Sequence, residues 1–367
     1  MEASNLLVQE LWDEVLDHLC NSRKDLLSSA LVCRAFVGRA QMHLFRSIII
    51  ASLRHQTTLS AAQLAEIISR SPHLIDYISE LYVGRCDVET LTPLVHILWS
   101  RVSAISLAHS DEGQVPALDL IGTLVSLPTL RKISFHSNAW EADHLRAVLA
   151  GCNPCVISLA FHTCSPELLP PNTENTLAPP PYGSPRLNIT HLELFFADTI
   201  PEFLGDAACP IDLSRVAHIK FGWSTGVGLY PLLYGFGDSI ESLDVDAGDP
   251  GLESLDFGSL SALSHLTVRG HGLSLQRAME LSRESNLRSI CYRMATWRGT
   301  TGLIGLQNIQ SSILSAKMPK LQRVEVMVVV DEYNKYTTAQ WTSRIEDNLS
   351  HLVKRGILTI QFHRLSL

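Results

Sequence analysis

One short apolar pattern recurs ten times along the 367 residues and constrains the fold more than any other feature of the sequence. The pattern is L-x-x-L-x-L, where L is any apolar residue, and its central positions lie 23 to 28 residues apart for most pairs and 33 or 34 apart for the others. Such a period indicates repeated units of a strand followed by a helix or turn, none of which buries its apolar face alone. The copies are Ile78-x-x-Leu81-x-Val83, Val102-x-x-Ile105-x-Leu107, Leu130-x-x-Ile133-x-Phe135, Val156-x-x-Leu159-x-Phe161, Ile189-x-x-Leu192-x-Leu194, Val216-x-x-Ile219-x-Phe221, Ile240-x-x-Leu243-x-Val245, Leu263-x-x-Leu266-x-Val268, Leu287-x-x-Ile290-x-Tyr292 and Leu321-x-x-Val324-x-Val326.

This is the period of leucine-rich repeats, so we predict an α/β solenoid, a leucine-rich-repeat-like horseshoe of about ten repeats over residues 73–367. Stacked units would share one continuous core and one curved sheet. A last apolar segment at residues 357–360 is expected to add a final strand or cap. The repeat also predicts a polar or Cys residue five positions after the central one, bonded to the backbone of the turn. The first four units have Cys86, Ser110, Asn138 and Cys164 at this position.

A proline-rich insertion at residues 165–186 separates the fourth unit from the fifth. Proline lacks the backbone donor that helices and sheet ladders use, so this density of proline predicts an extended surface insertion. The alternative is a proline-rich ligand for another domain.

Charge and composition narrow the class of partner and the compartment. The net charge is −8, with 29 basic and 37 acidic residues and no block of like charge. Because binding to phosphates needs clustered Lys and Arg, nucleic acid is not expected as a partner. No apolar run approaches the roughly 20 residues that span a bilayer, and the first residues lack the pattern of a secretory signal. Eight Cys in such a chain are expected to be reduced thiols. We therefore expect a soluble intracellular protein, cytoplasmic, nuclear or both, without a membrane partner.

The first fifty residues predict three short helices. Apolar residues recur at helical spacing in the first helix, and a second helix starts near Asp25 and a third near Phe36. A module this small exposes about as much apolar surface as it buries, so it needs a partner to cover it. The apolar residues of the three helices are Leu11, Val15, Leu16 and Leu19, then Leu26, Leu27, Ala30 and Leu31, then Phe36, Ala40, Leu44 and Phe45.

Two blocks of this segment occur in a fixed order and at a fixed distance. The first block is Leu-Val-Gln-Glu-Leu at residues 7–11, followed by Val15 and Leu19. The second is Ala-Leu-Val-Cys-Arg-Ala-Phe at residues 30–36, followed by Ala-Gln at 40–41 and His-Leu-Phe-Arg-Ser-Ile at 43–48. Together the two blocks resemble the F-box. Val8 departs from the family, which usually has a proline that pre-sets the backbone of the first helical turn.

The resemblance implies an F-box at residues 1–50, followed by a connecting helix at 51–72. An F-box docks onto the Skp-type adaptor of a cullin–RING ubiquitin ligase of the SCF type. The alternative is that the same side chains only close a helical cap on the solenoid. The residues expected to contact the adaptor are Leu7, Val8, Leu11, Val15, Leu31, Val32 and Phe36.

Residues that flank the central apolar position of each repeat alternate outward, onto the open face of the sheet. Their mixture of both charges, His and one Phe suits a protein or peptide better than a phosphate. We expect this face to bind a protein target, and we expect a monomer before the ligase assembles. The expected target-binding residues are His136, His162, Glu193, Phe195, Lys220, Asp244, Asp246, Arg269, Arg293 and Glu325.

Two short motifs are similar in sequence to catalytic or metal-binding sites. Gly222-Trp223-Ser224-Thr225-Gly226 matches the nucleophile elbow of serine hydrolases, but Ser224 also falls on the turn position of its repeat. Cys152 and Cys155 with His162 and Cys164 imitate a zinc site, but Cys164 is expected to point inward and His162 outward. We therefore expect no catalytic residue, no metal and no cofactor.

The sequence thus predicts a substrate-recruiting subunit of a ubiquitin ligase rather than an enzyme. One alternative is a leucine-rich-repeat scaffold for protein interactions, without attachment to a ligase. A minor alternative is a serine hydrolase that uses Ser224.

Overall fold

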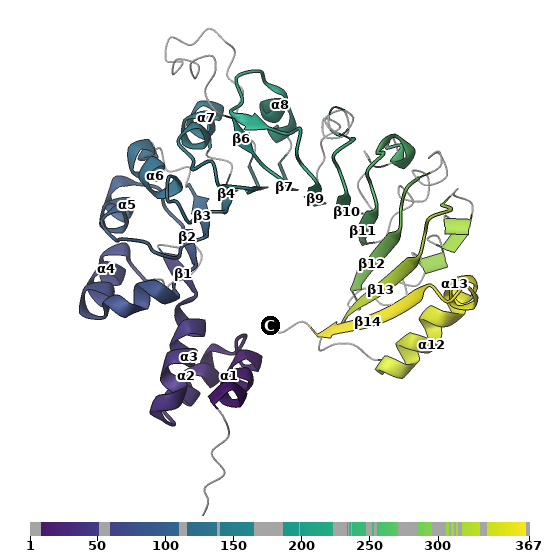
Figure 1. Ribbon diagram of the computed structural model, residues 1–367, viewed down its shortest axis with the longest axis horizontal. Helices are drawn as coiled ribbons and strands as arrows, with labels where there is room; N and C mark the ends of the chain where they lie inside the picture. Colours follow the sequence, from purple (N-terminus) through teal and green to yellow (C-terminus); the bar gives the residue numbers. More distant parts are fainter. Residues whose placement is uncertain are drawn as a thin grey trace, which may run out of the picture. The chain divides into compact units, whose positions relative to one another are not determined.

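The computed structural model describes residues 9–50, 59–109, 116–137, 140–164, 186–197, 199–222, 237–246, 255–270, 285–295, 318–330 and 336–364, with single positions between some of these ranges. Its fold is α/β (Figure 1). Twelve strands of the described residues form one sheet in the order β1-β2-β3-β4-β5-β7-β9-β10-β11-β12-β13-β14, and β6 and β8 form a second, two-stranded sheet. The chain divides into two compact units, Met1–Val156 and Ile157–Leu367.

The N-terminal unit begins with the three predicted helices and continues with a fourth helix and a 3₁₀ helix. Ser22 caps the second helix by accepting a hydrogen bond from the backbone of Asp25. Ser60 and Gln63 form a reciprocal capping box at the start of the fourth helix. The elements are α1 (Gln9–His18), α2 (Arg23–Ala30), α3 (Arg34–Phe45), α4 (Ala61–Arg70) and the 3₁₀ helix Pro72–Tyr77.

Four strands of this unit form three parallel pairs, and each strand is followed along the chain by a helix, as expected for a strand–helix repeat. We predicted that the repeats start at residue 73, but the sheet begins earlier. The alternating burial of Ile48 and Ile50 places an additional strand at the end of the three-helix segment. The elements are β1 (Ser47–Ile50), β2 (Glu80–Val83), α5 (Val88–Val95), β3 (Ala104–Ala108), α6 (Leu118–Val125), β4 (Lys132–His136) and α7 (Ala142–Ala150).

The C-terminal unit contributes eight strands to the large sheet, with fewer regular helices between them in the described residues. The sheet strands are β5 (Ser158–His162), β7 (His191–Phe195), β9 (His218–Gly222), β10 (Ser242–Asp246), β11 (His265–Arg269), β12 (Ser289–Ala295), β13 (Arg323–Val330) and β14 (Leu358–Arg364). The other elements are β6 (Leu187–Asn188), α8 (Ile200–Gly205), β8 (Ile211–Asp212), the 3₁₀ helix Phe257–Ser259, α12 (Thr338–Asn348) and α13 (Ser350–Lys354).

The core follows the predicted repeat. Each of the ten L-x-x-L-x-L segments ends in a strand of the large sheet, and all of their apolar positions are 0–4% exposed. The central residues lie opposite one another across the recorded strand pairs, from Leu81 to Ile133 in one unit and from Leu159 to Val324 in the other. The predicted register is therefore confirmed, and residues 357–360 contribute to a last strand, as predicted.

The turns after the strands also repeat. The Cys86 thiol donates to the carbonyl of Ala108, at 3.2 Å, which is the predicted bond from the turn position to the backbone. Burial raises the pKa of the Cys86 thiol, so this group stays protonated and can donate. Ser137, Thr163 and Phe196 have positive φ angles at the position before the turn residue. Ser110, Asn138 and insertion residues 165–185 lie outside the described residues.

Candidate functional site

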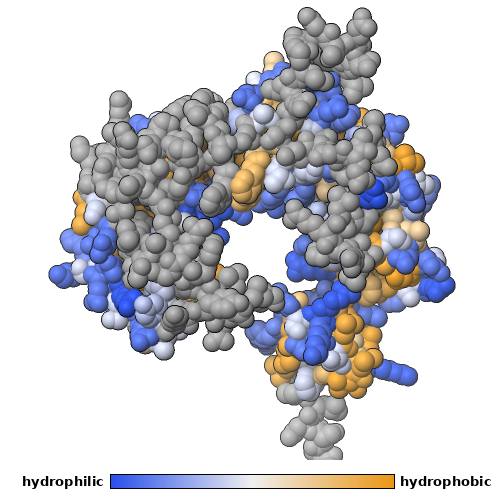
Figure 2. Space-filling view, turned by 180° about the vertical axis from the view of Figure 1, so that it is seen from behind, coloured by the Kyte–Doolittle hydropathy of each residue, from blue (hydrophilic) through white to orange (hydrophobic). Residues whose placement is uncertain are grey.

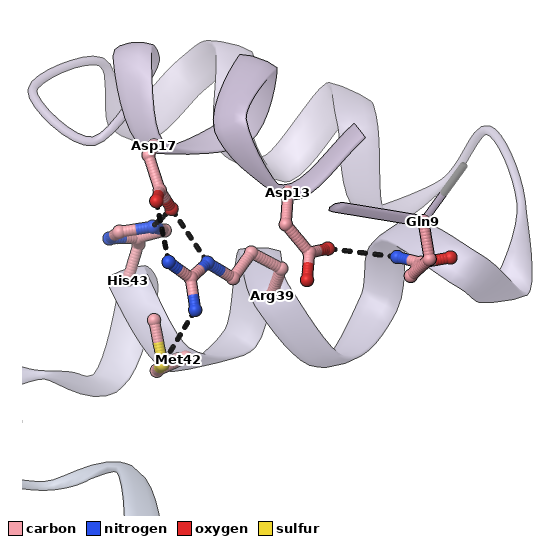
Figure 3. Close-up of polar contacts among 6 residues, drawn as sticks. All are labelled: Gln9, Asp13, Asp17, Arg39, Met42 and His43. Atoms are coloured by element: carbon pink, nitrogen blue, oxygen red, sulfur yellow. Dashed lines mark hydrogen bonds and ion pairs between the residues drawn. The ribbon is translucent and has the colours of Figure 1, made fainter. Parts of the chain in front are cut away.

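The three-helix segment has a very small core. Leu16, Leu26 and Ala40 are at most 1% exposed, one from each helix. A polar cluster adds to this core by joining α1 to α3 (Figure 3). The Arg39 guanidinium donates to both carboxylate oxygens of Asp17, at 2.6 and 2.5 Å, and the His43 Nε2 lies 2.7 Å from the same carboxylate.

The electrostatics of this cluster follow from its geometry. Hydrogen bonds from Arg39 and then from His43 hold the pKa of the Asp17 carboxyl well below its usual range. The Asp17 carboxylate in turn raises the pKa of Arg39. A bidentate Arg–carboxylate pair fixes orientation as well as distance. The cluster therefore positions α1 against α3, and its role is structural.

The outside of the same segment exposes large apolar side chains. Leu31 and Val32, in the turn between α2 and α3, are 89% and 70% exposed. Leu11 and Val15 lie one turn apart on α1, and Leu27 lies one turn before Leu31. We call these five residues the module surface. Figure 2 shows apolar side chains gathered over this segment.

Contacts between the helix ends bring parts of this surface together. The Gln9 side chain at the start of α1 donates to the backbone of Ala35 at the start of α3, at 3.3 Å. The Trp12 ring contacts the Phe36 ring, with centroids 5.0 Å apart. The first turn of α1 therefore lies beside the first turn of α3, which directly follows Leu31 and Val32 in the chain.

The residues predicted to contact the adaptor differ in their exposure. Leu11, Val15, Leu31 and Val32 are exposed, and Phe36 is half-buried against Trp12. Leu7 and Val8 lie outside the described residues. The sequence prediction did not include Leu27, which is exposed, because two adjacent leucines do not show which one faces the core; it also did not include Trp12.

A second surface lies on the strand face of the C-terminal unit, where Phe195 is the centre of a cluster. The His162 ring stacks on the Phe195 ring at 5.0 Å, with only 5° between their planes. The Lys220 ammonium lies 5.0 Å from the centroid of the Phe195 ring and the Arg269 guanidinium 5.3 Å from it. Cations at this distance are attracted by the ring quadrupole. Four strands, β5, β7, β9 and β11, thus contribute to one cluster.

The charges of this strand face are paired with one another. Arg269 donates to the carboxylate of Asp244 at 2.8 Å and to the backbone carbonyl of Phe221. Lys220 lies 3.6 Å from Glu193. The Arg269–Asp244 pair is well covered, with side chains 23% and 15% exposed. We call Phe195, His162, Lys220, Glu193, Arg269 and Asp244 the strand-face cluster.

The cluster needs the glycine at the end of β9. Phe195 and Gly222 lie opposite each other in the paired strands. A Cβ atom at residue 222 would lie 2.2 Å from Cδ1 of the Phe195 ring, a distance that real Cβ atoms do not show. The first glycine of the hydrolase-like motif therefore makes room for an aromatic ring. Ser224 lies outside the described residues.

The remaining predicted target contacts lie on strands but not all in one cluster. Glu325 pairs with the exposed Arg323 at 3.1 Å, and Asp246 and Arg293 lie opposite Arg269 on the two neighbouring strands, β10 and β12. His136 belongs to the N-terminal unit, where its ring lies 5.5 Å from that of Tyr82. Contacts therefore join six of the ten predicted residues into the strand-face cluster, and Asp246 and Arg293 lie directly beside it in the sheet. Sequence spacing alone could not show this grouping.

Two of the three cysteines of the zinc-like motif are buried, and Cys155 is exposed. Cys152 is buried after α7, and its thiol donates to the carbonyl of Val148 at 3.3 Å. Burial raises the pKa of Cys152 to about 12, and burial raises that of Cys164 to about 12. The two buried thiols thus pack in the interior of their units, and among the described residues no three His, Cys, Asp or Glu side chains converge as metal ligands.

Comparisons with known proteins give no relative: no family model matches the chain, and no curated protein matches it. None of the helices in the described part of the chain combines the length and the apolar character that crossing a bilayer requires.

Proposed function

We propose that this chain is an F-box protein: a substrate-recognition subunit of an SCF-type cullin–RING ubiquitin ligase. Its three-helix module would bind the Skp-type adaptor, and a leucine-rich-repeat-like solenoid built on the parallel sheet would bind a protein target. The ubiquitin transfer itself would belong to other subunits. The chain would act by holding its target at a high effective concentration near them.

The observation that carries this proposal is the exposure of the module surface. Leu31 is 89% exposed and Val32 is 70% exposed on a segment whose core has only a few residues. Covering one such side chain is worth roughly 1.5–3 kcal/mol, so a surface of five apolar side chains is expected to have a partner. Four residues of the F-box-like blocks, Leu11, Val15, Leu31 and Val32, belong to this surface.

The solenoid part of the proposal rests on the repeat register. Every central apolar residue of the ten segments is buried in a parallel strand, and Cys86 makes the expected bond in the turn. The strand-face cluster supplies a preorganised aromatic and charged surface for a protein target. Rigid aromatic and Arg side chains are the residue types that dominate binding energy at protein interfaces.

A pull-down of the full chain with purified Skp-type adaptor tests the proposal. Wild-type chain should retain the adaptor, and Leu31→Asp should weaken binding by at least about thirtyfold, or 2 kcal/mol. Leu98→Asp is the matched control, because Leu98 is 88% exposed and lies on a turn outside the module. This control should bind normally.

The outcome also separates the two classes of function. If the folded wild-type chain fails to retain the adaptor, the ligase proposal is wrong and an interaction scaffold without ligase attachment remains. If Leu98→Asp weakens binding as much as Leu31→Asp does, the module surface is not the adaptor site.

A further inference from the structure

The apolar side chains of the last strand of the sheet, β14, are less buried than those of the neighbouring strand, β13. Val324, Val326 and Val328 of β13 are 0% exposed. Their partners in register on β14 are Leu358, Ile360 and Phe362, which are only half-buried. Figure 1 shows β14 beside β13, with α12 and α13 next to it. The apolar inner layer of this unit thus ends at β14 without being closed.

The incomplete cover leaves an apolar groove beside the strand. This groove has a volume of about 280 Å³, and its lining includes Leu358, Ile360, Phe362 and Val353, with Thr342 and Glu346 at its polar side. Val353 of α13 is itself 43% exposed. Both the sheet and the helical layer therefore present apolar side chains at this end.

The backbone of β14 is also open along its outer edge. The Val324 N–H donates to the carbonyl of Ile357, at 2.8 Å, so the odd-numbered residues of β14 direct their polar backbone groups toward β13. In a parallel ladder the intervening residues direct theirs the other way. The N–H and C=O groups of Leu358, Ile360 and Phe362 thus point outward, where no strand of the described residues pairs with them.

Exposed edge strands normally have features that prevent them from pairing with another strand, such as lysine, proline, bulges or short length. Residues 358–363 read Leu-Thr-Ile-Gln-Phe-His and contain neither lysine nor proline. The register between β13 and β14 runs without a bulge over seven residue pairs. The other terminal strand, β1, has only four residues, and Leu59 already forms a bridge to its Ile50. The edge of β14 is therefore suited to pairing.

We propose that β14 is the interface of a homodimer, in which the β14 strands of two copies pair antiparallel across a two-fold axis at Ile360 or Gln361. With the axis at Ile360, Leu358 lies opposite Phe362 of the second copy and Thr359 lies opposite its Gln361. Apolar residues then meet apolar ones on the inner face, polar residues meet polar ones on the strand face, and no like charges oppose each other within residues 358–362.

A second copy fits this edge better than continued head-to-tail stacking. Two-fold pairing uses the same surface on both copies and closes after two, whereas pairing of β14 with β1 would give an open filament. The two apolar grooves would also lie on the same side of the joined sheet, so each helical layer would cover the other's groove. This proposal does not depend on adaptor binding, and it replaces the expectation of a monomer before assembly.

Opposite charges at residue 361 test the dimer directly. The mass of the full chain is measured by light scattering and sedimentation from about 1 to 100 µM, a range that covers specific dimers of ordinary affinity. Wild-type chain should be dimeric at the upper end. Gln361→Lys and Gln361→Glu should each raise the dimer dissociation constant at least tenfold, because like charges then face each other near the axis. An equimolar mixture of the two variants should dimerise again.

Ser343→Lys is the matched control, because Ser343 is exposed on α12 and does not line the groove; this variant should remain dimeric. Gln361→Lys loses the long contact of the Gln361 side-chain oxygen to His363, whereas Gln361→Glu keeps an oxygen there, so the recovery of dimer in the mixture is the result that reports charge. If either variant unfolds, Thr359→Lys and Thr359→Glu repeat the test. A wild-type monomer throughout the range, a dimer that both variants retain, or a mixture that stays monomeric would each overturn the proposal.

Discussion

The side chains of the module surface are exposed, whereas those of the strand-face cluster are half-buried and in contact with one another. On the module surface, Leu31 and Val32 are almost fully in contact with solvent. On the strand face, Arg269 and Lys220 face the Phe195 ring and are paired with carboxylates. Solvent-exposed apolar side chains provide binding energy when a partner covers them. A cluster of paired charges instead gives a fixed surface that selects its partner. Substitutions should therefore affect binding at the first surface and stability at the second.

The largest expected effect is on adaptor binding. A double variant, Leu27→Asp with Leu31→Asp, should reduce affinity for the Skp-type adaptor about a thousandfold, or roughly 4 kcal/mol. Its free energy of unfolding should change by no more than about 0.5 kcal/mol, because exposed side chains away from the core contribute little. Calorimetric titration and denaturant unfolding measure the two quantities. A loss of several kcal/mol in stability would show that this surface is part of the fold.

The second effect is on stability and concerns the charge pair of the strand face. Asp244→Ala should lower the free energy of unfolding by about 2 kcal/mol, because it leaves the well-covered Arg269 guanidinium without its carboxylate. Glu325→Ala is the control, because its partner Arg323 is 52% exposed and water can replace the carboxylate. The control should lose less than about 1 kcal/mol. Equal losses would contradict the claim that the cluster is preorganised.

The strand-face cluster also shows what the sequence could not predict. Alternation along each strand placed Phe195 and Arg269 on the outward face, but their contact joins residues on strands three places apart in the sheet. Which side chains touch across neighbouring strands depends on their length and on the space that Gly222 leaves. No periodic pattern in the sequence encodes either. The thirty buried positions of the repeats were predictable because burial depends on a regular spacing.

In the three-helix segment, too, the sequence predicted the local structure but not the packing. The spacing of apolar residues predicted all three helices, because amphipathic periodicity is a local signal. It did not show that Leu26 is buried while Leu27 is exposed, because that depends on how α2 packs against α3. It also missed β1, whose pairing partner β2 lies about thirty residues further along the chain.

A third prediction tests whether the Phe195 ring is the reason that residue 222 must be glycine. Gly222→Ala should lower the free energy of unfolding by about 1–2 kcal/mol, because the new methyl group displaces the Phe195 ring. In a Phe195→Ala background the same change should have almost no effect. Gly122→Ala is the control, since nothing lies within 4 Å of the added atom in α6. That substitution should be neutral or stabilising. Additive effects of the two strand-face changes would show that ring and glycine are not coupled.

The smallest expected effect is a pH dependence confined to the three-helix segment. Hydrogen bonds from Arg39 and His43 lower the pKa of Asp17 in the folded state below its unfolded value of about 3.9. The ionised carboxylate therefore stabilises the fold above about pH 4, and this contribution is lost as the pH falls through the lower, folded-state pKa. Because the Asp17 side chain is 41% exposed, solvent screens the pair, and its coupling at pH 7 should not exceed about 1 kcal/mol.

A double-mutant cycle with Asp17→Asn and Arg39→Gln measures this coupling, read as hydrogen exchange in α1 and α3. The coupling should be constant from pH 7 to pH 5 if the Arg39 contact dominates, and it should shrink between pH 4 and pH 2 as Asp17 takes up a proton. Exchange in β10 and β11 serves as the internal reference, because these strands belong to the other compact unit. A coupling that stays unchanged between pH 4 and pH 2 would show that the ionised Asp17 carboxylate does not carry it. The three-helix segment would then depend on its apolar core rather than on this ion pair, unlike the strand face, where the charge pair is well covered.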